Sequence, residues 1–201
     1  KSIARAARAA GVFAMEAMWT RYLPRITILS QLLADGALGD VNLVTADFSF
    51  AIDFDPKSRL FDPALGGGAL LDLGVYTVWF THLALGAPTI VSAVGSLAAT
   101  GVDQQAVVTL SYETDALAVA STSLLADGTV AASVSGTIAR VDVPNLFYAP
   151  GSLRVSQRGA DVLEWVDTSG LVEAQGLCYQ AAAAAQYIAD GRTDSPLHGL
   201  D

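Results

Sequence analysis

The sequence predicts one α+β domain in which a large, mostly antiparallel, open-faced sheet carries helices on one face. Two observations predict this fold class: helical patterns gather in the first 85 residues, and β-branched runs separated by short turns fill most of residues 89–166. Helices and strands grouped in this way are typical of α+β domains. With 201 residues, 52% of them hydrophobic, the chain can bury a substantial core.

The first 85 residues alternate between helical and extended patterns. Apolar residues at helical spacing, bounded by proline or glycine, predict three helices: residues 2–10, 24–35 and 69–85. Apolar runs between them predict two strands: residues 12–15 and 41–52. The loop over residues 53–67 is long for a compact domain, and such loops usually carry function.

The second half of the chain is rich in strands. β-branched runs predict six of them: residues 89–97, 106–112, 116–124, 130–138, 153–157 and 162–166. Connections of hairpin length between several of these runs predict an antiparallel meander. A last helix is expected over residues 171–189, where five consecutive alanines allow close packing, which we expect on the sheet.

One face of the predicted sheet is unusually neutral. The strands over residues 116–125 and 130–136 carry small apolar and hydroxyl side chains where solvated charges normally stand. A neutral face of this kind is more often covered than wet, so we expect a homodimer through it. The alternative is that alanine and serine are simply tolerated on a solvent-facing surface.

Charge and hydropathy exclude several kinds of partner. The chain has 20 acidic and 11 basic residues and a net charge of −9, which disfavours nucleic acid. Residues 73–102 contain no charged side chain, but Gly86, Pro88 and Gly95 interrupt them. We therefore expect a buried helix followed by a buried strand and no membrane span. One cysteine, Cys178, expected in the core, and no signal peptide pattern indicate a cytoplasmic protein.

Motifs for several chemistries are missing from the sequence. It has no G-x-S-x-G, H-E-x-x-H or C-x-x-C motif, and its histidines, His82 and His198, are 116 positions apart, so no metal site is expected. His82 falls off the helix stripe discussed next and is expected to be buried or at the dimer contact. The glycine triplet at 66–68 does not have G-x-G-x-x-G spacing after a strand, so it predicts no dinucleotide site.

The strongest local pattern pairs a carboxylate with a phenol. Asp72 and Tyr76 are four residues apart, so a helix projects both from one face. A tyrosine can act as a general acid or base if a nearby cation lowers its pKa from about 10. Lys1 and Lys57 offer no obvious partner. The alternative is that Asp72 pairs locally and Tyr76 is packed with its hydroxyl satisfied.

Two other clusters could contact a small polar substrate. Trp19 and Arg21 follow a predicted strand, where ligands of α/β proteins often lie, although packing of the Trp on its neighbours is the commoner arrangement. Arg59 and Asp62 precede the glycine triplet and could shape the mouth of a pocket or only pin the loop.

The order of these motifs resembles the C-terminal part of the Gfo/Idh/MocA oxidoreductases. Four segments carry the resemblance: Glu-Ala-Met-Trp-Thr-Arg at 16–21, Arg-Leu-Phe-Asp-Pro at 59–63, Gly-Gly-Gly-Ala-Leu-Leu-Asp-Leu-Gly-Val-Tyr at 66–76 and Thr-Gly-Val-Asp-Gln-Gln at 100–105. Within the family they are most similar to the branch that contains dimeric dihydrodiol dehydrogenase, which also oxidises D-xylose. The similarity extends over nearly the whole chain.

The resemblance implies a two-domain, NAD(P)-dependent enzyme acting on a CH–OH group of a sugar or cyclic diol. Residues 1–15 would be a remnant of its N-terminal Rossmann domain, and residues 16–201 its substrate and dimerisation domain, like the C-terminal domain of glyceraldehyde-3-phosphate dehydrogenase. Tyr76 would be the acid or base, with Asp72 beside it. Four side chains are expected to bind substrate: Trp19, Arg21, Phe48 and Arg59.

The chain departs from the family in what it lacks. The dinucleotide fingerprint is absent, and so is the Glu-Lys-Pro motif whose lysine would lower the tyrosine pKa, because Lys1 is too close to Gly11 to be that lysine. We therefore expect that this chain alone binds neither NAD nor NADP and cannot transfer hydride. A non-catalytic dimerising or sugar-binding module is the alternative.

Overall fold

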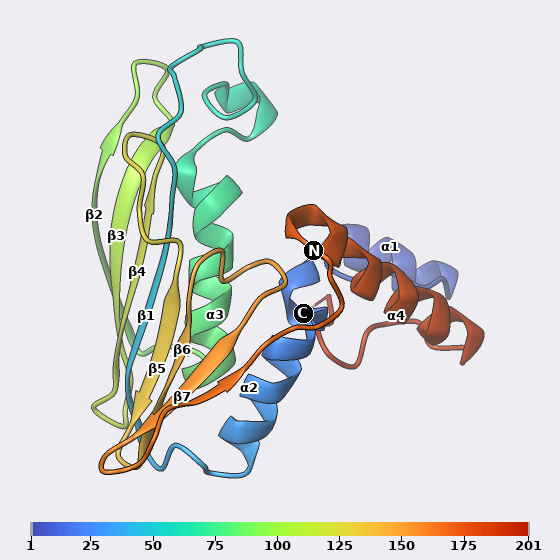
Figure 1. The fold of residues 1–201 in the computed structure, drawn as a ribbon. Helices are drawn as coiled ribbons and strands as arrows, with labels where there is room; N and C mark the ends of the chain where they lie inside the picture. Colours follow the sequence, from blue (N-terminus) through green and yellow to red (C-terminus); the bar gives the residue numbers. More distant parts are fainter. Residues whose placement is uncertain (1, 201) are drawn as a thin grey trace.

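A computed structural model describes residues 2–200 as one sheet with helices on one of its faces (Figure 1). The strands are β1 (Val41–Ser49), β2 (Ile90–Leu97), β3 (Asp103–Ser111), β4 (Leu117–Ser123), β5 (Ala132–Gly136), β6 (Ala139–Val143), β7 (Leu153–Gln157) and β8 (Leu163–Trp165). The α-helices are α1 (Ser2–Ala10), α2 (Pro24–Ala34), α3 (Val75–Leu85) and α4 (Leu177–Ala189). The predicted α+β class is confirmed.

The strand order is β2-β3-β4-β1-β5-β6-β7-β8, so the earliest strand lies in the middle of the sheet. Every neighbouring pair is antiparallel except β1 and β4, which are parallel. The long excursion from β1 through α3 and the β2–β3 hairpin returns the chain to lie beside β1 in the same direction. A simple meander is therefore interrupted by the insertion of β1.

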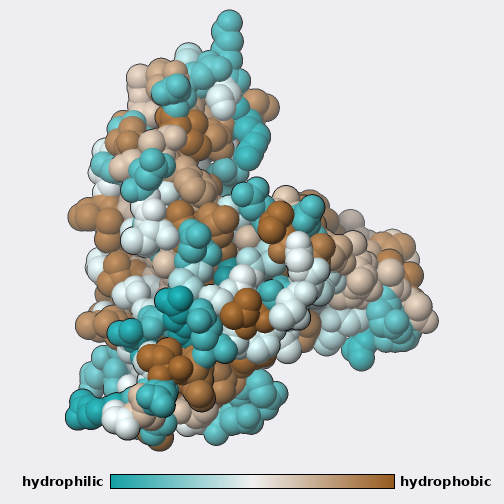
Figure 2. Space-filling view, in the orientation of Figure 1, coloured by the Kyte–Doolittle hydropathy of each residue, from teal (hydrophilic) through white to brown (hydrophobic). Residues whose placement is uncertain are grey.

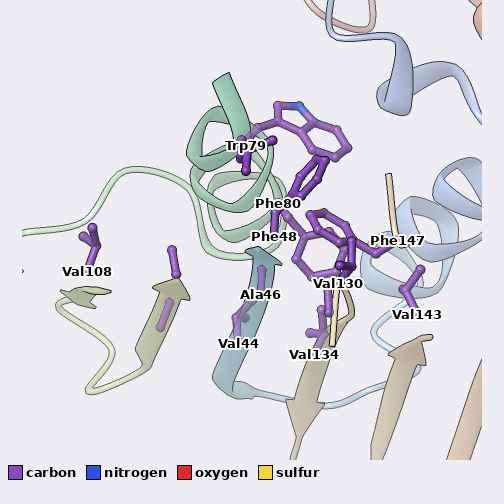
Figure 3. Packing of buried hydrophobic residues seen from close by; sticks show 14 of the residues in the cluster. Val44, Ala46, Phe48, Trp79, Phe80, Val108, Val130, Val134, Val143 and Phe147 are labelled. Atoms are coloured by element: carbon purple, nitrogen blue, oxygen red, sulfur yellow. The ribbon is translucent and has the colours of Figure 1, made fainter. Parts of the chain in front are cut away.

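The core lies between this sheet and α3. Phe48 of β1, Phe80 of α3 and Phe147 gather there, and Figure 3 shows their rings meeting above the central strands. Phe147 makes edge contacts with Phe80 at 5.6 Å and with Phe48 at 6.1 Å between ring centroids. Small residues on the strands beneath, such as Ala118 and Ala120, are buried and allow the helix to lie close to the sheet. Because these rings hold one side of α3 against the sheet, the opposite side of the helix faces outward in a defined direction.

The helix that was expected over residues 69–85 has two parts. A π-helical turn, Leu70–Gly74, precedes α3. The carboxylate of Asp103, at the start of β3, accepts a hydrogen bond of 2.6 Å from the Leu70 N–H and so satisfies one of the free donors at this helix start. π-turns are rare and often lie at functional sites.

Several local predictions are wrong. Residues 12–15 form no strand, and the ladder hydrogen bonds among residues 2–200 leave them out; instead the Ala14 N–H donates to the Thr193 carbonyl at 3.2 Å. The run over residues 130–138 is split, because a turn at residues 137–138 starts the unpredicted strand β6. The strand β2 is not buried but is a largely exposed edge strand.

The last helix also differs from the prediction. It starts at Leu177 after a short 3-10 turn, Glu173–Gly176, and contacts the Trp19–Tyr22 turn rather than the sheet. In Figure 1 it projects to the right, away from the strands, beside α1. None of its side chains is buried, and Cys178 is exposed rather than in the core. Its alanine run therefore does not pack on the sheet.

One segment of the described chain is apolar and long enough to cross a membrane. It runs from Pro63 to Leu85, and 44% of its most apolar window is buried inside the protein. Its buried side chains, which include Trp79 and Phe80, belong to the core between α3 and the sheet. A core helix of a globular domain has this character.

Candidate functional site

A hollow of about 490 Å³ opens beside the start of α3. Asp72 and Tyr76 both lie in its wall, as their four-residue spacing predicts. Eleven of the described residues line it: Glu16, Ala17, Met18, Leu71, Asp72, Val75, Tyr76, Val78, Trp79, His82 and His198. The wall thus combines one phenol, two carboxylates and two imidazoles with apolar side chains, a composition suited to a small polar ligand.

The Tyr76 hydroxyl is held from behind. It accepts a hydrogen bond of 2.9 Å from the indole N–H of Trp19, which lies 57 residues earlier in the chain. The ring of Tyr76 contacts Phe48 at 5.3 Å and Tyr148 at 5.7 Å between centroids, and Tyr148 stacks on Phe48 at 4.3 Å. The four aromatic residues Trp19, Phe48, Tyr76 and Tyr148 form what we call the aromatic cluster. Only Tyr76 of this cluster lines the hollow.

Tyr76 is a neutral phenol in this chain. Burial raises its pKa above 10.0, and the negative charge of Asp72 acts in the same direction, whereas the Trp19 hydrogen bond opposes them. A neutral phenol can donate its proton to a developing oxyanion. To accept a proton at neutral pH it needs a further positive charge in the hollow.

Asp72 is paired with Arg59, not with Tyr76. The Arg59 guanidinium donates to the Asp72 carboxylate at 2.5 Å, and this contact raises the pKa of Arg59. The Arg59 side chain is 68% exposed while that of Asp72 is 23% exposed, so the pair sits at the rim of the hollow. It ties the loop over residues 53–67 to the start of the helix that carries Tyr76. Asp72 is therefore paired locally, as the alternative expected, and it also lines the hollow.

The residues expected to bind substrate are only partly brought together. Trp19 and Phe48 lie behind Tyr76 in the aromatic cluster, and Arg59 reaches the rim through Asp72. Arg21 is half-buried and outside the wall of the hollow, and burial lowers its pKa. A contact of these four side chains with substrate remains a prediction.

Sequence reasoning missed several residues of the site. His82 is exposed and lines the hollow, so its expected burial is wrong, while a place at a dimer contact stays a prediction. His82 lies off the helix face that carries Asp72 and Tyr76, but the hollow is wide enough to include both positions. His198 reaches the hollow from the C-terminal segment, where its backbone N–H donates to Ser195 at 3.1 Å. No local pattern in the sequence signals that long-range approach.

A metal centre has no basis in the part of the chain that is described. Among residues 2–200 no group of three or more His, Cys, Asp or Glu side chains could hold a metal ion. The polar groups that the hollow offers are a phenol, carboxylates and imidazoles.

Comparison with known proteins identifies the family. Residues 26–142 match the model of the GFO/IDH/MocA C-terminal domain. This chain belongs to the GFO/IDH/MocA family. It is 33% identical over 198 residues to trans-1,2-dihydrobenzene-1,2-diol dehydrogenase of Xenopus tropicalis, with 96% of this chain and 59% of that protein covered. The protein of the same name from Danio rerio is 40% identical over 153 residues, covering 75% of this chain and 45% of the relative.

Solved structures of this GFO/IDH/MocA domain agree with the fold. An aldose-aldose oxidoreductase from Caulobacter crescentus, complexed with glycerol, superposes with a TM-score of 0.80 at 25% identity, covering 96% of this chain and 58% of that one. Levoglucosan dehydrogenase, solved with NADH and levoglucosan, has a TM-score of 0.78 at 17% identity, which shows a shared fold. The chain spans about three fifths of the length of the Xenopus tropicalis dehydrogenase and of the Caulobacter crescentus oxidoreductase.

Proposed function

We propose that this chain is the substrate-binding and dimerisation part of an NAD(P)-dependent oxidoreductase that acts on a CH–OH group of a sugar or a cyclic diol. The observation that carries the proposal is that the Tyr76 phenol and the Asp72 carboxylate line one open hollow. The names of the diol dehydrogenases and of the aldose oxidoreductase support the substrate class.

The wall of the hollow suits a nicotinamide ring. Leu71, Val75 and Val78 expose apolar side chains on the side of the helix that faces the hollow, and a flat ring could cover them. The cofactor, when bound, accepts or supplies the hydride. The sequence of this chain contains no dinucleotide fingerprint, so the phosphates of the cofactor would be held by another part of the protein. Family members solved with NADP or NADH support this choice of cofactor.

Tyr76 would handle the proton of the substrate. During carbonyl reduction the neutral phenol donates its proton to the oxygen that gains negative charge, a role its raised pKa favours. During alcohol oxidation a phenolate takes the hydroxyl proton, and the resemblance assigns the cation that stabilises it to a lysine outside this chain. Asp72, fixed by Arg59, would hold a neighbouring hydroxyl of the diol or sugar.

We extend the proposal to the partner and the location of the protein. A homodimer would form through the open sheet face, and the partner in the hollow would be a small-molecule substrate, with neither a membrane nor nucleic acid as a partner. One cysteine in the sequence supports a cytoplasmic location.

The test is a Tyr76→Phe variant of the full-length protein. With NAD or NADP and a panel of aldoses and cyclic diols, kcat is expected to fall by a factor of about 10² to 10⁴, because proton transfer by a positioned side chain contributes this much. Tyr187→Phe, which removes a phenol hydroxyl on α4, is the matched control and should keep its kcat. Unchanged turnover in Tyr76→Phe would reject the proposal.

The same experiment addresses the non-catalytic alternative. If the full-length protein turns over none of these substrates, while this chain alone binds a sugar without nicotinamide, then the chain is a binding module. If the protein is active and the chain alone binds no sugar, the proposal stands.

A further inference from the structure

The hydrogen bond between Trp19 and Tyr76 fixes a direction for the phenol proton. An indole N–H can only donate, so at 2.9 Å the Tyr76 oxygen must be the acceptor. The Tyr76 O–H is then free to point to another acceptor, and the hydrogen bonds among residues 2–200 include none that it donates. Because Tyr76 lies in the wall of the hollow, a ligand bound there can accept this proton.

We infer that Trp19 is a positioning residue for Tyr76: its indole N–H holds the phenol oxygen so that the phenol proton faces the substrate. This inference rests on the proposed function and assigns Trp19 a different role from the substrate contact expected from the sequence. Trp19 is 7% exposed and does not line the hollow, so its ring offers no face to a ligand from this side.

The indole is held rigidly enough to do this. Thr20, next to it, donates a hydrogen bond of 2.8 Å to the Tyr148 carbonyl, and the Tyr148 ring meets the indole edge-on at 5.9 Å. On another side, Gly176 packs so closely that a Cβ there would lie 2.8 Å from the Trp19 ring. A donor that cannot rotate loses little entropy on binding its acceptor.

The phenol ring is fixed independently of Trp19. Its backbone belongs to α3, and Phe48 and Tyr148 contact its ring. Both partners of the hydrogen bond are therefore supplied by packed elements, and the bond needs no reorganisation when the proton moves. Preorganised donors of this kind are the ones that stabilise developing charge well.

The proton transfer balances without any change to Trp19. In oxidation the substrate O–H bond breaks and an O–H bond forms on the Tyr76 phenolate, while the hydride leaves the carbinol carbon with its electron pair for the nicotinamide. In reduction both steps reverse. The Trp19 N–H stays bonded throughout and is strongest when the oxygen is charged, because charge-assisted hydrogen bonds are about twice as strong as neutral ones. This hydrogen bond thus lowers the pKa of Tyr76, whereas burial and the charge of Asp72 raise it.

The first test uses this chain and needs no cofactor. The Trp19→Phe variant removes the donor and keeps an aromatic ring. The pKa of the Tyr76 hydroxyl, followed by the ¹³C NMR shift of the ring carbon that bears it, should then rise by about one pH unit, which corresponds to a roughly tenfold weaker acid. Trp165→Phe, on the distant strand β8, is the matched control and should leave this titration in place. An unchanged Tyr76 titration in folded Trp19→Phe overturns the inference.

A second measurement covers the case in which Trp19→Phe does not fold. In the wild-type chain the indole N–H resonance of Trp19 should be slow to exchange with solvent and should shift as Tyr76 titrates, and in Tyr76→Phe that shift should vanish. If the chemical shift of the Trp19 indole N–H does not change as Tyr76 titrates, the inference is wrong, whether or not Trp19→Phe folds.

Kinetics of the full-length enzyme separate this inference from the proposed function. A positioning role predicts that Trp19→Phe lowers kcat about tenfold, moves the tyrosine limb of the pH profile upward and leaves KM nearly unchanged. A substrate contact predicts a raised KM with kcat and the pH profile preserved, which would overturn the inference while leaving the proposed function intact. If Tyr76→Phe itself keeps full activity, the proposed function fails, but the hydrogen bond can still be measured in the chain.

Discussion

At the scale of single residues, burial of His198 in the wall of the hollow couples stability to pH. Burial lowers its pKa below 6.5; Arg21 and His82 act in the same direction, and the carboxylate of Glu16 opposes them. Between the folded pKa and 6.5 the unfolded chain binds more protons, so the free energy of unfolding falls as the pH drops through this window and levels off below it. His198→Asn removes this titration. Urea unfolding from about pH 7.5 to about pH 5 should show a shallower acid loss in the variant than in the wild type, and equal slopes would contradict the prediction.

The same scale shows what the sequence could predict of the site. Four-residue spacing was enough to place Asp72 and Tyr76 in one wall, because the π-turn that carries Asp72 runs directly into α3, which carries Tyr76. The donor to Tyr76 comes from 57 residues away, and no local pattern reports such a contact. Trp19 was selected by its motif, yet only its position behind the phenol shows what its N–H does. Cys178 was misplaced because apolar neighbours on α4 do not reveal that the helix projects from the sheet.

At the scale of elements, the loop over residues 53–67 depends on one close backbone approach. A Cβ on Gly67 would lie 2.8 Å from the Leu60 carbonyl oxygen and 2.9 Å from those of Arg59 and Asp62, all of them backbone atoms. Gly67→Ala must therefore displace the turn that presents Arg59 to Asp72. We expect a loss of about 1–3 kcal/mol in the free energy of unfolding by urea titration.

A neighbouring glycine provides the control for that variant. Gly66 has a φ of +73° and open space around its Cβ position, so Gly66→Asn, which tolerates left-handed backbone, should unfold close to the wild type. If Gly67→Ala is as stable as Gly66→Asn, the close approach does not constrain the loop.

Most elements could be predicted from the sequence, and the exceptions share a cause. Proline, glycine and apolar spacing predict α2 and the long helix, because those signals are local. The π-turn at Leu70–Gly74 and the capping of its start by Asp103 depend on the β2–β3 hairpin folding back, so the spacing alone could not show them. The short strand β6 was hidden because the two residues of the turn before it, Thr137 and Ile138, are β-branched and continue the strand pattern.

At the scale of the whole molecule, the sheet face away from the helices is neutral over half its width. On β1 to β4 the outward positions carry aliphatic, hydroxyl and amide side chains. The charged side chains of these four strands are those of Asp47 and Asp103, and the Asp103 carboxylate accepts the hydrogen bond from the Leu70 N–H at the helix start. The Asp47 carboxylate accepts hydrogen bonds of 2.8 Å from the hydroxyl groups of Ser49 and Ser121, so it is stabilised within the chain. The outward faces of β6 to β8 instead carry exposed ion pairs of Arg140 and Arg154. Brown and pale atoms border the left margin of Figure 2, where Figure 1 draws β2.

This asymmetry predicts where two copies would meet. A homodimer centred on β3, β4 and β1 would cover apolar area such as Val107, which is 42% exposed, without burying the arginines. Val107→Arg places a charge in that contact and should convert the dimer to a monomer in light scattering across a dilution series, because an unpaired buried charge is costly. Thr114→Arg, in the exposed turn before β4, adds the same charge outside the contact and should remain dimeric. A wild-type chain that stays monomeric at the highest concentration, or a dimer that survives Val107→Arg, would show that this neutral face is not where the copies join.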